Sequence, residues 1–131
     1  MVEPDGTDDR ELLDRYMAAF ENADMESLLT LLRDGVELEM PPHLEWFRGK
    51  KDVVRFLRVR AFAGQGAGHV RMVAVRANGQ PAVVAYERDA DGVLRAHSVQ
   101  VLTVEAGGVA RLTVFLDPGL FASFGLPGIL L

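Results

Sequence analysis

Residues 70–87 read VRMVAVRANGQPAVVAYE, a pattern typical of two strands joined by a tight turn. Two valine-rich runs, 70–77 and 80–87, flank the dipeptide Asn78-Gly79. An Asn-Gly pair in this position is the strongest short-range signal for a β-hairpin, because both residues tolerate the positive φ angles of a type I′ turn. We therefore predict an antiparallel pair of strands connected by two residues.

Strand signals continue beyond this hairpin. An Asp-Gly turn precedes a strand-like run at 93–105, and a Gly-Gly turn separates that run from the next one at 109–117. The apolar spacing after residue 118 indicates a short terminal helix over 120–124. The second half of the chain is thus expected to form an antiparallel meander.

The N-terminal half has helical periodicity instead. Apolar residues recur every three or four positions between residues 9 and 20, after a capping box that begins at Asp8. Asp24 is a suitable N-cap for a second helix, which we expect to end at Gly35. Residues 1–8 are polar and are expected to form a flexible N-terminus.

A strand and a third helix complete the pattern. Residues 36–40 alternate apolar and acidic side chains, as a half-buried strand does, and a third helix is expected over 50–62. Three N-terminal helices and a curved, mostly antiparallel sheet predict an α+β domain over 9–127. A sheet curved around helices leaves a cone that can hold a small molecule. The apolar tail, 128–131, could dock on the domain, on a partner or on nothing.

Composition and charge exclude several classes of protein. The chain has 131 residues, a net charge of −5 and no cysteine. The acidic balance argues against direct contact with nucleic acid, which requires clustered lysine and arginine. No apolar run is long enough to cross a bilayer and the N-terminus lacks a secretory pattern, so we expect a cytoplasmic domain without membrane contact. Because His43, His69 and His97 lack ligand spacing, no metal or other cofactor is expected.

Several longer strings resemble a known family. The strings are Glu39–Pro42, Trp46–Gly49, Arg76–Ala82, Arg95–Leu102 and Phe115–Phe121. Together they resemble the SnoaL-like C-terminal domain of actinobacterial extracytoplasmic-function sigma-70 factors and, more distantly, ketosteroid isomerase. The resemblance implies a nuclear transport factor 2-like cone, in which three N-terminal helices pack on the curved sheet. It also implies that the sigma factor's DNA-binding regions or RNA polymerase are the partners.

The resemblance further implies which side chains line the cone. The tyrosine donor of the isomerase matches Tyr16, its base falls on Met40 and its second oxyanion donor falls on Gln100. A thioether cannot accept a substrate proton, so we expect no steroid-isomerase chemistry and assign no catalytic residue. The residues expected to line one mostly apolar pocket are Tyr16, Phe20, Met40, Trp46, Phe56, Gln100, Phe115 and Asp117.

Strand alternation assigns side chains to the two faces of the sheet. If Gln100 faces the cone, regular alternation places His97 on the opposite face. On the last strand, Asp117 is expected to share a face with Phe115. The residues of the long strand expected to share a face with Gln100 are Ala96, Ser98 and Leu102.

The expected function is regulatory. We expect a domain that senses a small apolar ligand in its cone and modulates the contact of a sigma factor with polymerase or promoter. An alternative is a small isomerase-like, cyclase-like or epoxide-hydrolase-like enzyme, in which Asp117 acts as base and Tyr16 and Gln100 as donors. A third interpretation is a dimerisation module that pairs two copies through Val99 and Val101 on the outer face of the sheet.

Overall fold

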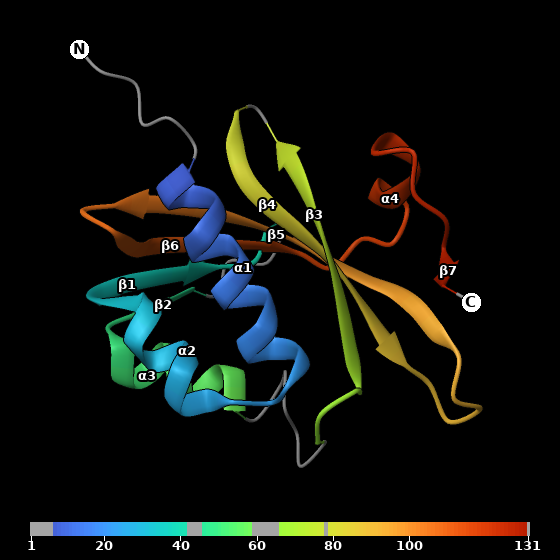
Figure 1. Ribbon diagram of the computed structural model, residues 1–131, viewed down its shortest axis with the longest axis horizontal. Helices are drawn as coiled ribbons and strands as arrows, with labels where there is room; N and C mark the ends of the chain where they lie inside the picture. Colours follow the sequence, from blue (N-terminus) through green and yellow to red (C-terminus); the bar gives the residue numbers. More distant parts are fainter. Residues whose placement is uncertain (1–6, 42–45, 59–65, 78, 131) are drawn as a thin grey trace.

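The chain described by the computed structural model, residues 7–41, 46–58, 66–77 and 79–130, folds as a curved sheet with helices on both of its faces (Figure 1). No helix in these ranges is both long and apolar enough to span a bilayer. In chain order the elements are α1 (Thr7–Glu21), α2 (Met25–Leu31), β1 (Leu32–Glu39), β2 (Trp46–Arg48), α3 (Lys50–Leu57), β3 (Val70–Ala77), β4 (Gln80–Arg88), β5 (Leu94–Glu105), β6 (Gly108–Phe115), α4 (Leu120–Ser123) and β7 (Ile129–Leu130).

In the described part of the chain the sheet has seven strands: six follow the order β2-β1-β6-β5-β4-β3, and β7 pairs separately with β5. Strand β1 runs parallel to β6, whereas the other paired strands are antiparallel. The sheet is therefore mixed and mostly antiparallel. Helix α1 packs on β3 and β4, and α3 packs on β1 and β2.

The predicted hairpin is present. Ala77 pairs with Gln80, so two residues connect β3 to β4. Gly79 has a φ of +79°, in the left-handed region that a tight hairpin turn requires and that glycine tolerates best. Asn78 lies outside the described residues.

The helices depart from the prediction in their boundaries. Asp24 does cap α2, because its Oδ1 accepts a hydrogen bond from the Ser27 backbone N–H at 3.1 Å. The predicted end at Gly35 is wrong: α2 ends at Leu31, Leu32 is extended, and Gly35 lies within β1. The pairing of β1 with β6 overrides the helical spacing of the leucines.

The predicted three-helix arrangement needs a further correction. Among the described residues, two strands, β1 and β2, separate α2 from α3 where one was predicted, whereas α4 is the short terminal helix that was predicted after residue 118. Helix α1 begins at Thr7, one residue before the predicted cap. The predicted end of the third helix near residue 62 lies outside the described residues.

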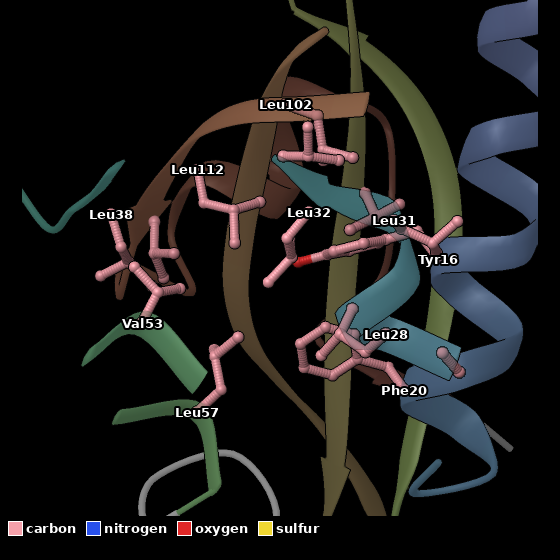
Figure 2. Close-up of a cluster of buried hydrophobic side chains, with 14 of the residues drawn as sticks. Tyr16, Phe20, Leu28, Leu31, Leu32, Leu38, Val53, Leu57, Leu102 and Leu112 are labelled. Atoms are coloured by element: carbon pink, nitrogen blue, oxygen red, sulfur yellow. The ribbon is translucent and has the colours of Figure 1, made fainter. Parts of the chain in front are cut away.

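The main core lies between the helices and the concave face of the sheet. Figure 2 shows side chains from α1, α2, α3 and the strands meeting there. Fully buried members include Tyr16, Leu28, Leu38, Leu102 and Leu112. These side chains supply the apolar burial that holds the helices on the sheet.

A second apolar cluster lies on the opposite face of the sheet. Val84, Tyr86 and Val99 form it together with Phe121 from α4. The C-terminal segment thus docks on the domain, and Tyr86 Oη donates to the carbonyl oxygen of Pro127 at 2.7 Å. The dimerisation hypothesis expected Val99 on an open outer face, where a second copy could pair with it. Val99 is instead buried beneath this segment.

Candidate functional site

A cavity of about 120 Å³ opens between α1, α3 and the concave face of the sheet. Most of its wall is apolar, as is usual for small-molecule pockets. The apolar lining includes Phe20, Met40, Phe56, Leu57, Met72 and Val114. The polar lining residues among those described are Glu87, His97, Ser98 and Gln100.

Gln100 is held from behind by Tyr16. The Tyr16 Oη donates to Gln100 Oε1 at 2.5 Å, and this hydrogen bond joins α1 to β5 inside the protein. Burial raises the pKa of Tyr16 far above its usual value, so the hydroxyl stays protonated and remains a donor. Tyr16 itself does not line the cavity, contrary to the prediction. Its contribution to the site is to fix the orientation of the Gln100 side chain.

Two polar groups on β5, the Gln100 amide nitrogen and the Ser98 hydroxyl, face the cavity. Gln100 is 8% exposed and Ser98 is 1% exposed. Neither the Gln100 amide nitrogen nor the Ser98 hydroxyl is hydrogen-bonded within the described residues. Among the described residues, every fully buried side-chain nitrogen or oxygen has a hydrogen-bond partner. Because these two atoms have none, they are not fully buried, and the cavity that both residues line gives access to them. A few such groups in an apolar wall orient a bound molecule.

The carboxylate of Glu87 is flanked by two imidazoles. Its oxygens lie 3.4 Å from His97 Nε2 and 3.8 Å from His69 Nε2. Glu87 and His97 line the cavity and are partly exposed, so they mark its solvent side. Glu87 was not among the residues predicted to line the pocket.

A β-bulge explains why His97 faces the cavity. Ala85 pairs with Ser98, but Tyr86 pairs with Ala96, so His97 is an extra residue on β5. Such an insertion interrupts the strict alternation of faces. The prediction that His97 faces away from the cone, and that Ala96 faces it, is therefore wrong: Ala96 packs against the second cluster.

Strand β6 also has the opposite alternation from the one predicted near its end. Val114 and Leu116 line the cavity, whereas Phe115 packs in the second cluster on the other face. Asp117 is exposed after the end of β6, and its Oδ1 accepts a hydrogen bond from the Gly119 N–H at 3.0 Å. This is the role of a turn residue. Phe115 and Asp117 are thus not pocket residues.

Trp46 is also outside the cavity. Its side chain is 55% exposed on the edge strand β2, with the Arg48 guanidinium 5.2 Å from its ring centre. The neighbouring Phe47 faces inward instead, and its ring centre lies 4.7 Å from that of Phe56. Because neighbours on a strand face opposite sides, an inward Phe47 requires an outward Trp46.

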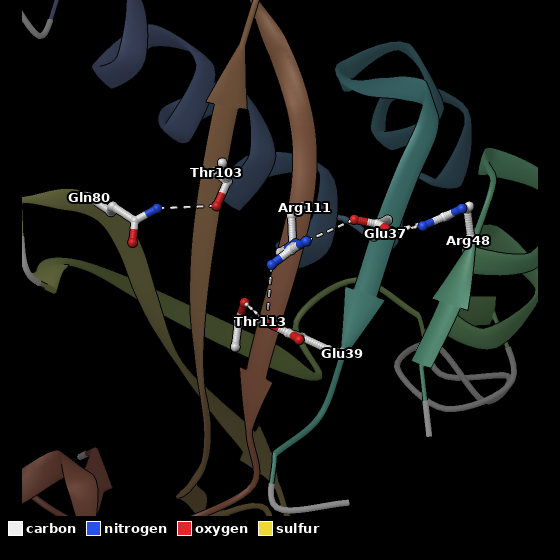
Figure 3. A network of polar contacts seen from close by, with 7 residues as sticks. All are labelled: Glu37, Glu39, Arg48, Gln80, Thr103, Arg111 and Thr113. Carbon is white, nitrogen blue, oxygen red and sulfur yellow. Dashed lines mark hydrogen bonds and ion pairs between the residues drawn. The ribbon is translucent and has the colours of Figure 1, made fainter. Parts of the chain in front are cut away.

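A separate polar network lies across β2, β1 and β6 (Figure 3). Glu37 accepts hydrogen bonds from Arg48 Nη2 at 2.7 Å and from Arg111 Nη2 at 2.9 Å. Both hydrogen bonds lower the pKa of the Glu37 carboxyl, and the one from Arg48 has the larger effect. Thr113 Oγ1 donates to Glu39 Oε1 at 3.0 Å in the same network. The five residues lie on three different strands, so the network ties these strands together, and none of the five lines the cavity.

Comparison with known families matches this fold and sequence to a known domain. Residues 13–112 match the family described as SnoaL-like domain. This chain belongs to the SnoaL-like family. Among curated proteins, the ECF RNA polymerase sigma factor SigG of Mycobacterium tuberculosis is 37% identical over 124 residues, which are 95% of this chain and 33% of the relative. The SnoaL-like chain thus spans about one third of the length of this sigma factor.

Solved structures confirm the nuclear transport factor 2-like fold of this SnoaL-like domain. A candidate ketosteroid isomerase from Kribbella flavida is 24% identical with a TM-score of 0.61, over 84% of this chain and 78% of that one. An NTF2-like protein of unknown function from Mesorhizobium loti is 15% identical with a TM-score of 0.67, over 89% and 97% of the two chains. At these identities the likeness concerns the fold alone.

Proposed function

We propose that this SnoaL-like domain is a non-catalytic regulatory domain of an RNA polymerase sigma factor that binds a small ligand in its cone. The observation that carries the proposal is the amide nitrogen of Gln100, which faces a mostly apolar cavity and has no hydrogen-bond partner among the described residues. Tyr16 holds that amide in place, so the donor is already oriented before a ligand arrives. A pre-oriented polar group in an apolar wall is suited to recognition.

The groups present support binding more than turnover. Met40 lines the cavity at the position where the resemblance to ketosteroid isomerase expects a base. A thioether cannot take a substrate proton, and the enzyme alternative based on Asp117 fails because Asp117 lies outside the cavity. The Tyr16 hydroxyl is already engaged by Gln100. A dedicated isomerase would present a base and a free donor pair to its substrate.

A second candidate function is proton transfer at the cavity entrance. Glu87 and His97 lie 3.4 Å apart and both line the cavity. A carboxylate that orients an imidazole is a common general acid–base pair. This candidate differs from the first in a measurable way, because it requires that a bound molecule be consumed.

Similarity to the sigma factor supports the partners that we propose. They are the DNA-binding regions of the sigma factor or RNA polymerase, without direct contact to nucleic acid, and with such partners we propose a cytoplasmic location for the domain. A ligand can change such a contact only if it binds the two states of the protein with different affinities. Ligand control therefore predicts that ligand and sigma regions affect each other's binding reciprocally.

The test combines binding and turnover measurements on the full chain. We would screen a broad set of small molecules, aromatic and aliphatic, neutral and charged, by thermal shift and then titrate the sigma factor's DNA-binding regions, as a separate polypeptide, with and without each hit. We expect hits to raise the melting temperature, to remain unconsumed and to change the affinity for the sigma polypeptide. A hit consumed at a rate that collapses in His97→Ala would favour the enzyme instead. Absence of binding to the sigma polypeptide would contradict the proposed partnership.

A further inference from the structure

The size of the cavity limits what it can hold. Its volume of about 120 Å³ is well below the roughly 300–1,000 Å³ of pockets for drug-sized ligands. It is close to the engineered protein cavity of about 150 Å³ that binds benzene. The cavity therefore admits one ring at most, with part of any substituent at its open side, whereas a fused-ring molecule such as a steroid is too large.

The deep side of the cavity presents a hydrogen-bond donor. The Tyr16 hydroxyl donates to Gln100 Oε1, so the amide oxygen is used and the amide NH₂ group is left for the cavity. The high pKa that burial gives Tyr16 keeps this polarity unchanged across the working pH range. Ser98, next along this face of β5, adds a hydroxyl. A ligand oxygen that accepts hydrogen bonds, such as a carbonyl, matches these groups.

The solvent side presents an acceptor. The Glu87 carboxylate has no hydrogen bond within the described residues, and its oxygens lie 3.4 Å from His97 Nε2 and 3.8 Å from His69 Nε2. A carboxylate can accept several hydrogen bonds and repels a negatively charged ligand group. A ligand hydroxyl or amine is favoured at this end, and a carboxylate is disfavoured.

We infer that the cavity selects a neutral, single-ring molecule with a carbonyl-type acceptor at its deep end and a hydroxyl or amine donor at its outer end. This inference rests on the proposed ligand-binding function and narrows it to one chemical class. The selectivity comes from two groups, the nearly buried Gln100 and the more exposed Glu87, and the apolar residues of the wall accommodate the ring. Each hydrogen bond contributes on the order of 1 kcal/mol, which is roughly a five-fold change in affinity.

Four matched probes test this selectivity by calorimetric or NMR titration of the full chain. They are 4-hydroxyacetophenone, 4-ethylphenol without the acceptor, acetophenone without the donor, and the two-ring 6-acetyl-2-naphthol. We expect 4-hydroxyacetophenone to bind about five-fold more tightly than either single-ring analogue, and 6-acetyl-2-naphthol to bind more weakly than all three. Equal affinities for the single-ring probes, or tightest binding of the two-ring probe, would overturn the inference.

Variants assign each end of the ligand to its residue. Gln100→Leu should remove the preference over 4-ethylphenol, and Glu87→Ala should remove the preference over acetophenone. Ser98→Ala is a second, milder test of the deep end if Gln100→Leu fails to fold. Glu105→Ala is the matched control, because Glu105 is exposed outside the cavity and pairs with Arg33; it should leave all affinities unchanged.

Failure of this inference and failure of the proposed function give different results. If only the two-ring probe binds, the domain binds a ligand but the size argument is wrong. If 4-hydroxyacetophenone binds but the variants do not change its preference, the assignment of the two ends is wrong. If none of the four probes binds, the inference falls, and the wider thermal-shift screen decides whether the domain binds any small molecule.

Discussion

Tyr16 and Gln100 form the polar pair on which both the core and the candidate site depend. Tyr16 is fully buried on α1 and Gln100 is nearly so on β5, and their side chains meet at 2.5 Å. A buried polar group without a partner is costly, so each residue compensates the desolvation of the other. The pair thereby positions α1 against the sheet while it orients the NH₂ group of the Gln100 amide toward the cavity.

Tyr16→Phe tests this dependence. The change leaves the buried Gln100 Oε1 without its donor, so we expect a loss of about 1–3 kcal/mol in the free energy of unfolding. Urea denaturation measures the loss. The double variant Tyr16→Phe/Gln100→Leu replaces both polar partners and should be less destabilised than the sum of the two single variants. Strict additivity would show that the two residues are not coupled.

Glu37 should make stability depend on pH in the acid range. Hydrogen bonds from Arg48 and Arg111 lower its folded-state pKa, so its contribution is present above the unfolded pKa of about 4.3 and is lost as the pH falls through the folded value. The difference in unfolding free energy between the wild type and Glu37→Gln should therefore shrink as the pH is lowered below about 4.3. Urea melts over a pH series measure it. Because Glu37 is solvent-accessible, high salt should reduce the difference, and a difference independent of both pH and salt would contradict this role.

At the scale of single elements, local signals were predictable and pairing between strands was not. The hairpin next to Gly79 and the Asp24 cap depend on neighbouring residues and can be predicted from them. The bulge at His97 depends on how β4 and β5 pair, and no glycine marks its position in the sequence. One unpredicted residue of this kind reverses which side chains face the cavity, so His97 was misplaced and Ala96 with it.

The same limit explains the misplaced end of the second helix. Leu28, Leu29 and Leu32 continue a helical spacing, yet Leu32 already belongs to β1 and pairs with Val109. Contact with a strand far along the chain decides its conformation, and such contacts are not visible in a local pattern. In the candidate site, the helical spacing and the family resemblance predicted four residues that do line the cavity: Phe20, Met40, Phe56 and Gln100.

Gly79→Ala tests the hairpin as an element. Gly79 has a φ of +79°, a backbone conformation that is strained in a residue with a Cβ atom. Alanine at this position should therefore lower the unfolding free energy by on the order of 1 kcal/mol. Gly35→Ala is the matched control: Gly35 lies in β1, its φ is not positive, and a methyl group added to its Cα would meet no atom within 4 Å. Thermal or urea denaturation should show little change or a slight gain for Gly35→Ala. Equal losses at both sites would contradict the turn geometry.

At the scale of the whole molecule, the C-terminal segment makes one part of the sheet buried on both faces. The main core covers the concave face, and α4 with β7 covers Val84, Tyr86 and Val99 on the other. Ala96 N–H donates to the carbonyl oxygen of Gly128 at 2.8 Å and extends this attachment along β5. The cavity opens on the concave face alone, so attachment of the C-terminal segment and ligand binding use opposite sides of the same strands.

Phe121→Ala should separate these two faces. Phe121 is 1% exposed and its ring meets that of Tyr86 at 5.0 Å in an edge-to-face arrangement. Removing it should cost about 3–5 kcal/mol in unfolding free energy, because the cavity that it leaves is closed in by the sheet and the C-terminal segment. The exposed Ser123 in the same helix is the control, and Ser123→Ala should change stability by less than about 0.5 kcal/mol. In conditions where Phe121→Ala is still folded, its affinity for 4-hydroxyacetophenone should equal that of the wild type, since Phe121 does not line the cavity. A loss of affinity as large as that in Gln100→Leu would instead show that the C-terminal segment and the cavity are coupled through the sheet.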